Sequence, residues 1–391
     1  MSANLRSRLQ RMREAARQTV ADAGPARAEG GDLGFPAGWS HVADGVRRAG
    51  WCSQPLGLAT QAPIRLAAFA RRFSAETADP RRVAFFDFET TGLSGGAGTI
   101  AFLAAIGRID EAGSVRVVQY FLDDYPAERA FIQHVSEALL DVDAIATYNG
   151  SSFDMPLLLT RRAMHGLDAM PAVPHVDVLH PVRRLYRTTK GACALSSIEA
   201  TILDCSRDGD IPGSEVPQVW FDFVKQGQCD RLQRVFVHNR LDIVSLARLF
   251  FHVGLIAGGA AEDPLCDPIG RAELESRLDS DRAERTLRGA LASGDLRASR
   301  ALMRLYRQQE RWQERLDMVP LLPDDPAGLF SRSVYAERVR HDIDEALALA
   351  LRSSELARPG STLRQRALRR VDRLRIVLAG GQSSGSSSSG R

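Results

Sequence analysis

The sequence predicts a mixed α/β domain followed by an all-helical region. Apolar runs of strand length recur between residues 83 and 178, apolar residues at helical spacing follow to 257, and helix succeeds helix from 270 onward. The 391 residues are too many for one core of ordinary size, so we expect two or three units. A composition of 44% hydrophobic and 25% charged residues excludes a wholly disordered or fibrous chain.

Five segments have the length and composition of strands: 83–89, 99–109, 115–122, 143–148 and 173–178. The second and third are joined by a short link that contains Gly113, which predicts a hairpin. Helical spacing over 127–140 and 153–166 indicates crossovers between the later strands. The order predicts a mixed five-stranded sheet flanked by helices, with its ligand site at the carboxyl ends of the parallel strands.

Further helices are expected before and after the strands in the sequence. Helical spacing predicts an amphipathic helix over 3–22 and later helices over 195–203, 214–226 and 229–257, and 64–74 fits a second short helix. Residues 23–60 are rich in Gly, Pro and Ala, which is typical of a linker. We therefore expect an N-terminal helix and flexible linker over 1–80, the α/β domain over 81–258, a helical region over 259–378 and a disordered tail over 379–391.

The helical region contains a weak internal repeat. A shift of 33 residues places Val339–Arg340 over Tyr306–Arg307 and Leu349 over Leu316. This period suits helix pairs of the tetratricopeptide type, and an irregular helical bundle explains the pattern equally well. In either case the region offers a surface for a protein partner.

The segment FFDFETTG (85–92) carries the strongest chemical signal. Residues two apart share a face of a strand, so Asp87 and Glu89 project together and Phe86 and Phe88 project to the other face. Adjacent carboxylates repel each other and are costly to bury, and a divalent cation such as Mg²⁺ or Mn²⁺ resolves the conflict. Taken alone, the segment also fits a strand end whose acids reach solvent.

Two further segments supply carboxylates. The turn in NGSSFD (149–154) ends the fourth strand and places Asp154 at the carboxyl edge of the sheet, while HNRLD (238–242) places His238 and Asp242 on one helical face. Individually these fit a helix cap and a surface ion pair. Their order on this framework, together with the first pair of acids, indicates a common site.

The three segments resemble the exonuclease motifs of the DEDD superfamily, which has a ribonuclease H-like fold, over about 83–257. HVDVLHPVRRLYR, LSSIEATIL, DGDIPGSEVP and HNRLDIVSLARL are similar to the YprB-like bacterial proteins, in which a tetratricopeptide-like region follows this domain. The resemblance implies a metal-dependent 3′–5′ exonuclease acting on single-stranded nucleic acid. Its two ions, Mg²⁺ or Mn²⁺, would be held by Asp87, Glu89, Asp154 and Asp242.

His238 departs from the family pattern. Family members usually carry a tyrosine four residues before the last Asp or a histidine five residues before it, and here a histidine stands four residues before it. Because an imidazole can accept a proton from water near neutral pH, His238 is a candidate general base. The alternative is a helix-face residue hydrogen-bonded to Asp242.

Residues next to these acids are candidates for substrate binding. They are Thr90, Thr91, Gly92 and Leu93 for a terminal nucleotide, Asn149 and Phe153 for a sugar and base, and Arg183, Arg184, Arg187 and Lys190 for phosphates, with Tyr186 for stacking. A solvated helix face explains the basic cluster equally well.

The main alternative is a catalytically weak nucleic-acid-binding or scaffold protein whose helical region recruits partners. Clustered anions facing phosphate argue against it, and the spacing of His238 argues for it. A phosphotransferase of the haloacid dehalogenase type requires D-x-D, whereas position 89 is Glu. ATP hydrolysis is not indicated, because the sequence has no G-x-x-x-x-G-K-[ST] loop.

The remaining features concern location. No run approaches the ~18 uninterrupted apolar residues that span a bilayer, so we expect no membrane partner. The start MSANLRSRLQ lacks the apolar stretch of a secretory signal, and the five cysteines are sparse and odd in number. Both observations favour a reducing, cytoplasmic location.

Overall fold

The structure, a computed structural model, describes residues 34–384 except 58–61, 74–75, 93–97, 192, 204–206 and 208. The chain divides after Asp267 into two compact units, which are described separately. This division comes later than the expected boundary at 258, and the Asp267 amide donates a hydrogen bond to the Leu185 carbonyl within the first unit. The helix expected over 3–22 lies outside the described residues.

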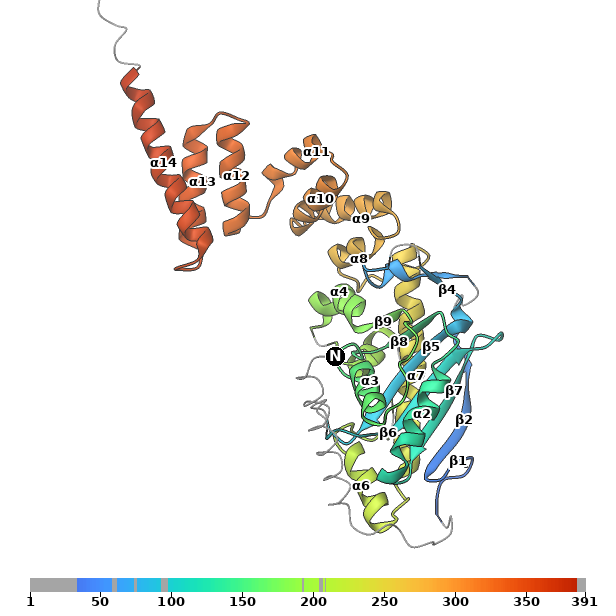
Figure 1. The fold of residues 1–391 in the computed structure, drawn as a ribbon. Helices are drawn as coiled ribbons and strands as arrows, with labels where there is room; N and C mark the ends of the chain where they lie inside the picture. The colour runs from blue at the N-terminus through green and yellow to red at the C-terminus, as the bar shows by residue number, and fades with distance from the viewer. Residues whose placement is uncertain are drawn as a thin grey trace, which may run out of the picture. The chain divides into compact units, whose positions relative to one another are not determined.

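A seven-stranded mixed sheet in the order β1-β2-β7-β6-β5-β8-β9 forms the centre of the first unit (Figure 1). β5, β8 and β9 are parallel, and the other neighbouring pairs are antiparallel. The five expected strands are present and contiguous. In chain order the strands are β1 Ser40–Ala43, β2 Val46–Pro55, β5 Val83–Thr90, β6 Ala101–Ile109, β7 Ser114–Leu122, β8 Ala144–Thr147 and β9 His175–Asp177.

β1 and β2 correct the prediction from sequence. The prediction of a linker over 23–60 was wrong at residues 40–43 and 46–55, where these two strands form. The sheet therefore has seven strands and not the predicted five. β2 is mostly exposed, so it lacks the dense apolar run that marks an interior strand. At its first residues, the Arg47 guanidinium pairs with Asp123 at 2.9 Å and lies 4.0 Å from the centre of the Phe35 ring.

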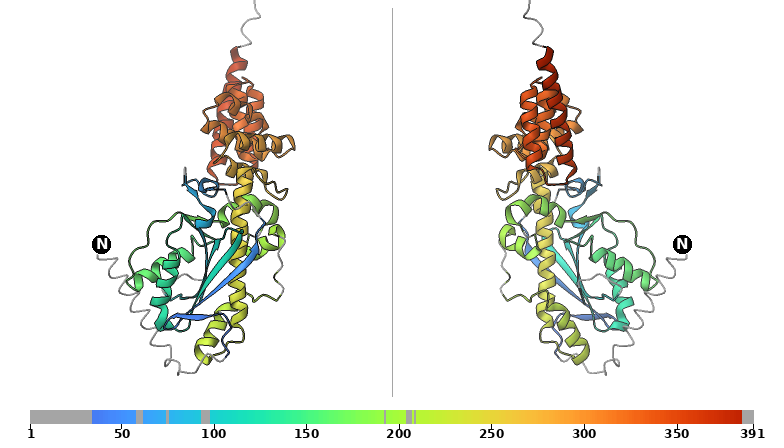
Figure 2. Two further views of the ribbon diagram at one scale, coloured as in Figure 1. Left: turned by 90° about the vertical axis from the view of Figure 1, so that its right-hand side faces the viewer. Right: turned by 90° about the vertical axis from the view of Figure 1, so that its left-hand side faces the viewer.

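Side chains of β5 alternate between the two faces of the sheet. Different helices cover these two faces (Figure 2). α2 (Glu128–Ala138), α3 (Asp154–Met164) and α6 (Val216–Gln226) share a hydrophobic core with Phe86 and Phe88. α7 (Leu232–Gly258) covers the other face, where the Phe85 and Phe250 rings lie 5.5 Å apart. Asp87 and Glu89 share the face of Phe85, so both acids lie on the α7 side of the sheet.

α7 approaches the sheet closely at Gly107 of β6. A Cβ atom at this position would lie 2.4 Å from Ile243 Cγ2 and 2.9 Å from Val115 Cγ1. α7 is long and apolar enough to cross a membrane by length and composition, but 56% of its most apolar window is buried inside the protein. Its apolar character is accounted for by this packing against the sheet.

The prediction of a second short helix over 64–74 was wrong. β3 (Ile64–Arg65) pairs with β4 (Thr77–Ala78), and between them lies the 3₁₀ turn η1 (Leu66–Ala68). The apolar residues that suggested a helix are buried against α7 instead. Phe69, for example, stacks on Phe250 with 4.4 Å between the ring centroids.

The segment after β9 is helical. α4 (Leu179–Lys190) comes first, then α5 (Leu195–Ile198) and the π-helical turn η4 (Glu199–Leu203). The helices expected over 195–203, 214–226 and 229–257 are therefore confirmed. Tyr186 attaches α4 to α7, because its hydroxyl lies 2.7 Å from His252 Nε2 and donates to Asp263 Oδ2 at 2.7 Å.

The second unit confirms the expected helical region. Its helices are α8 Pro268–Glu275, α9 Ser280–Ala292, α10 Arg297–Gln308, α11 Trp312–Asp317, α12 Pro326–Arg338, α13 Ile343–Leu356 and α14 Thr362–Ser384, with the 3₁₀ turn η5 Val319–Leu321. One core joins α8, α9 and α10 and a second joins α12, α13 and α14. α14 continues past residue 378, where the helical region was expected to end, and residues 385–391 lie outside the described part of the chain.

The 33-residue shift does not relate residues in equivalent environments. Tyr306 is fully buried whereas Val339 is 46% exposed, and Leu349 is buried whereas Leu316 is 40% exposed. The helical region is thus present, and its tetratricopeptide-like character stays a prediction.

We expect Gly107→Ala to destabilise the first unit by about 1–3 kcal/mol, because the added methyl group overpacks the contact between β6 and α7. Urea unfolding of the full chain measures the effect. Gly50→Ala on β2 is the matched control, because a Cβ there meets nothing within 4 Å. Combining Gly107→Ala with Ile243→Ala should lose less stability than the sum of the single changes. Equal stability of the Gly107 and Gly50 variants would contradict the packing argument.

Candidate metal and active site

The structure brings five chemically active side chains together from three elements. β5 supplies Asp87 and Glu89, α3 begins with Asp154, and α7 supplies His238 and Asp242. His238 Nε2 lies 3.9 Å from Glu89 Oε1 and 3.5 Å from Asp242 Oδ2. Ligand atoms of these three residues all lie within 4.8 Å of one another.

Burial raises the pKa of each of the four carboxyl groups, and mutual repulsion adds to this effect for Asp87 and Glu89. The pKa values of Asp87 and Glu89 lie well above their ordinary range, first because both groups are buried and then because neighbouring carboxylates repel their charges. Burial raises the pKa of Asp154 to about 7. Burial also raises the pKa of Asp242, although the positive charge of Arg207 opposes it. Full ionisation of this site therefore requires compensating positive charge.

The donor set fits a divalent cation. Carboxylate oxygens are the ligands that hard cations prefer, and an imidazole nitrogen is compatible with several divalent metals. Glu89, His238 and Asp242 form the group that could hold an ion. Asp87 and Asp154 are near enough to interact electrostatically with this group and with each other.

A buried amide chain holds Asp87. The Asn239 side chain donates to Asp87 Oδ2 at 2.9 Å, and Gln119 of β7 donates to Asn239 Oδ1 at 3.0 Å. Asn239 is fully buried and Gln119 almost so. Sequence reasoning missed both residues, although Asn239 lies inside the HNRLD segment. These two hydrogen bonds hold Asp87 Oδ2 toward α7, whereas Oδ1 accepts no hydrogen bond from the Asn239 amide.

Asp177, at the end of β9, organises the turn that leads to Asp154. Its Oδ1 accepts hydrogen bonds from the Asn149 and Leu179 amides at 2.8 and 3.1 Å, and its Oδ2 accepts from the Ser151 amide at 3.0 Å. Asn149 adopts a positive φ of 67° in this turn. Sequence reasoning did not single out Asp177, because its partners lie on a different strand connection.

A second loop reaches the site through Arg207. Its guanidinium donates to Asp242 Oδ1 at 2.6 Å and to Asp210 Oδ2 at 3.2 Å, and it also pairs with Glu199 of η4. Asp210 in turn lies 2.8 Å from Nδ1 of His238. These residues were not predicted, although Asp210 lies within the DGDIPGSEVP segment, Arg207 directly precedes that segment and Glu199 lies within LSSIEATIL.

The candidate substrate residues beside β5 lie in a hydrogen-bonded loop. Thr90 Oγ1 donates to the Gly92 carbonyl at 3.0 Å, and Thr91 Oγ1 accepts from the Ile100 amide at 3.0 Å. Leu93 lies outside the described residues. Phe153 is half-buried immediately before Asp154. The two threonine hydroxyls thus shape the loop.

The basic cluster lies on α4. Arg183, Arg184 and Arg187 are exposed, whereas the side chain of Lys190 lies outside the description. Arg183 is near enough to Tyr148, the residue before the NGSSFD turn, to influence its pKa. The prediction that Tyr186 stacks on a base was wrong, because this side chain is fully buried against α7.

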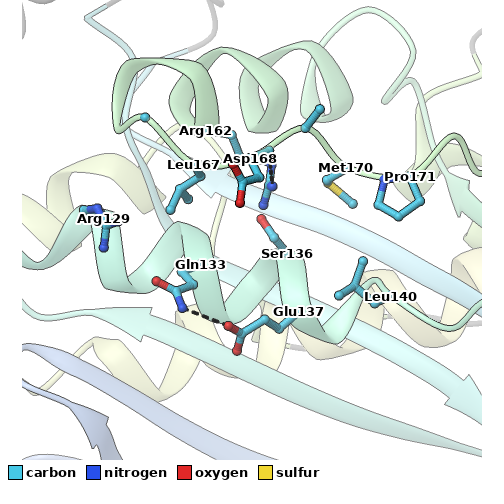
Figure 3. A pocket seen from close by; sticks show the side chains of 12 residues that line it. Arg129, Gln133, Ser136, Glu137, Leu140, Arg162, Leu167, Asp168, Met170 and Pro171 are labelled. Carbon is cyan, nitrogen blue, oxygen red and sulfur yellow. Dashed lines mark hydrogen bonds between the residues drawn. The ribbon is translucent and has the colours of Figure 1, made fainter.

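A separate pocket of about 410 Å³ lies between α2 and the end of α3 (Figure 3). Its wall combines Leu140, Leu167 and Met170 with Arg129 and polar groups. Both helices pack on the Phe86 and Phe88 face of the sheet, so this pocket is not the place where the carboxylates meet.

Comparisons with known proteins identify a family for this chain. A model of the RNase H superfamily matches residues 84–253. The chain is 30% identical over 296 residues to the uncharacterized protein YprB of Bacillus subtilis (strain 168), an alignment that covers 72% of this chain and 71% of YprB. The match to YprB is too long to be confined to the RNase H-like segment.

We expect the metal-free protein to lose stability as the pH rises from about 4 to about 7, because the raised pKa of Asp154 favours a protonated carboxyl in the folded state. Its contribution is present below the unfolded pKa and is lost as the pH rises through the folded pKa. Mg²⁺ should therefore raise the melting temperature more at about pH 8 than at about pH 5.5.

Thermal unfolding in EDTA and in Mg²⁺ at both pH values measures this effect. Asp154→Asn should flatten the pH dependence, whereas Asp222→Asn at a half-buried position on α6, outside the carboxylate cluster, should leave it unchanged. Comparing variants cancels other titrations, such as that of His175, whose pKa burial lowers. Identical pH dependence in wild type and Asp154→Asn would contradict the expectation.

Proposed function

Because the chain belongs to the family of the Bacillus subtilis protein YprB and contains a domain of the RNase H superfamily, we propose that it is a metal-dependent 3′–5′ exonuclease of single-stranded nucleic acid. The observation that carries the proposal is the convergence of β5, α3 and α7 on one cluster of acids with raised pKa values. If Asp154 were only a helix cap and His238 with Asp242 only a surface ion pair, these residues would have no reason to lie beside Asp87 and Glu89. The 3′–5′ polarity is proposed from the resemblance of the three segments to DEDD exonuclease motifs.

Asp87, Glu89, Asp154 and Asp242 are the proposed ligands of two Mg²⁺ or Mn²⁺ ions. When bound, such ions offset phosphate charge and lower the pKa of coordinated water. The protein contributes the placement of these ligands. Hydrogen bonds from Gln119 to Asn239 and from Asn239 to Asp87 hold Asp87. Hydrogen bonds to Asp177 hold the turn that leads to Asp154.

His238 is the proposed general base. Its Nε2 faces Glu89 and Asp242, so it can take a proton from a water molecule that attacks phosphorus on this side of the sheet. The new bond joins the water oxygen to phosphorus, and the bond from phosphorus to the 3′ oxygen of the preceding nucleotide breaks. The product is a nucleoside 5′-monophosphate.

The nucleic acid is proposed to enter past α4 and the 90–92 loop. Exposed Arg183, Arg184 and Arg187 offer phosphate contacts, and α4 begins two residues after Asp177, which is bonded to the turn before Asp154. We also propose a cytoplasmic location and a protein partner for the helical unit.

One observation favours a second candidate, a catalytically weak nucleic-acid-binding or scaffold protein. Arg207 donates to Asp242 Oδ1 at 2.6 Å and thereby satisfies an oxygen that a metal ligand would need. An arginine in this position partly offsets the charge of the cluster without an ion. Activity measurements separate the two candidates.

We expect the protein to shorten single-stranded DNA or RNA, labelled at the 5′ end, progressively from the 3′ end in Mg²⁺ or Mn²⁺, with no activity in EDTA. Alanine at Asp87, Glu89, Asp154 or Asp242 should abolish activity, because each change removes a metal ligand. His238→Ala should reduce kcat by ~10²–10⁴-fold, the usual contribution of positioned proton transfer.

Calorimetric titration with Mg²⁺ separates these roles, because binding should weaken in the four acid variants and persist in His238→Ala. Asp222→Ala on α6, outside the carboxylate cluster, is the control for a lost acid. Cleavage that persists in EDTA would exclude the metal-dependent mechanism. Absence of cleavage by the wild type with intact nucleic-acid binding would favour the scaffold candidate.

We expect Arg183→Gln combined with Arg187→Gln to raise KM and to flatten its salt dependence, because about two phosphate contacts are lost. kcat should change little, since neither residue belongs to the carboxylate cluster. Arg129→Gln combined with Arg375→Gln removes the same charge from exposed positions on α2 and α14 and serves as the control. The same rise in KM for both pairs would indicate a general charge effect without a binding role for α4.

A further inference from the structure

The imidazole of His238 lies between two different acidic surroundings. Nδ1 lies 2.8 Å from Asp210 Oδ2, whereas Nε2 faces Glu89 and Asp242 at 3.9 and 3.5 Å. The Nδ1 contact has hydrogen-bond length, while the two Nε2 distances exceed it. Among the residues that the structure describes, Nδ1 thus has a direct hydrogen-bond partner at ordinary length and Nε2 does not.

Both carboxylate oxygens of Asp210 accept hydrogen bonds that hold its side chain in place. The Ile211 amide donates to Oδ1 at 2.8 Å, and Arg207 donates to Oδ2 at 3.2 Å. Arg234, one helical turn before His238 on α7, donates to the carbonyls of Gly209 and Asp210 at 3.0 and 3.1 Å. The loop that carries Asp210 is therefore attached to the helix that carries His238.

We propose that Asp210 is a positioning residue that fixes the neutral His238 ring in the tautomer with a proton on Nδ1 and directs the Nε2 lone pair toward Glu89 and Asp242. An ionised carboxylate only accepts hydrogen bonds, so the ring must donate from Nδ1. Burial opposes ionisation of Asp210, but hydrogen bonds from His238, the Ile211 amide and Arg207 hold its pKa below the usual range.

This orientation decides what His238 can do. With the proton on Nδ1, Nε2 can accept a proton or bind a cation; with the proton on Nε2, it can do neither. The kinetic consequence rests on the proposed exonuclease function, whereas the tautomer itself does not. Asp210 acts through His238 and has no direct part in the reaction.

The tautomer is measured by ¹⁵N NMR of the full chain with labelled histidine, free of metal and at about pH 8, where an ordinary histidine is neutral. His238→Gln identifies the His238 signals by their loss. We expect the wild type to be protonated predominantly on Nδ1, Asp210→Asn to shift a substantial fraction to Nε2, and Asp222→Asn to match the wild type. A wild-type ring protonated on Nε2, or an unchanged ring in Asp210→Asn, would overturn the proposal. The wild-type spectrum alone decides if Asp210→Asn does not fold.

Exonuclease kinetics test the consequence in the same variants. Asp210→Asn should lower kcat by ~10²-fold or more with KM changed less than about threefold, because the loss affects proton transfer and not substrate binding. Asp210→Glu, which restores the carboxylate, should recover part of kcat. Unchanged kcat in Asp210→Asn would contradict a positioning role. A wild type without activity would instead refute the proposed function, and the NMR result would still decide the orientation of His238.

Discussion

Mutual repulsion among closely placed carboxyl groups is the constraint around which the first unit is organised. Asp87 and Glu89 are half-buried beside the buried Asp154 and the half-buried Asp242, and loss of solvation together with repulsion raises the pKa of the first two well above normal. Such a cluster persists only where neighbouring groups donate hydrogen bonds to its oxygens or offset its charge. The Asn239 amide and the Arg207 guanidinium do so from α7 and from the 207–211 loop.

α7 links this cluster to the stability of the sheet. Its apolar side chains, among them Ile243 and Phe250, pack against β5 and β6, and the absence of a side chain at Gly107 sets how closely it approaches. The same helix presents His238 and Asp242 to the acids of β5. Because the core contacts and the site share one helix, small displacements of α7 also change the distances between ligand groups.

The candidate site was predictable where its residues follow local periodicity. Spacing of two on a strand placed Asp87 with Glu89, and spacing of four on a helix placed His238 with Asp242. The supporting residues follow no such rule. Gln119 on β7 donates a hydrogen bond to Asn239 on α7, and the loop residue Asp210 contacts His238 on α7. Both contacts depend on how segments that are distant in the sequence pack together. The buried Tyr186 shows the opposite error, because neighbouring arginines suggested an exposed aromatic residue.

The sequence by itself determined five of the seven strands, the crossover helices, the helical region and the acids that meet on β5, α3 and α7. These features arise from apolar periodicity and local spacing, which the chain carries in every short segment. The tertiary structure decided that β1 and β2 extend the sheet, since both strands are mostly exposed and leave little apolar pattern in the sequence. It also decided which polar groups hold Asp87 and His238. Such hydrogen bonds join residues far apart in the chain, and their geometry exists only once α7 has packed on the sheet.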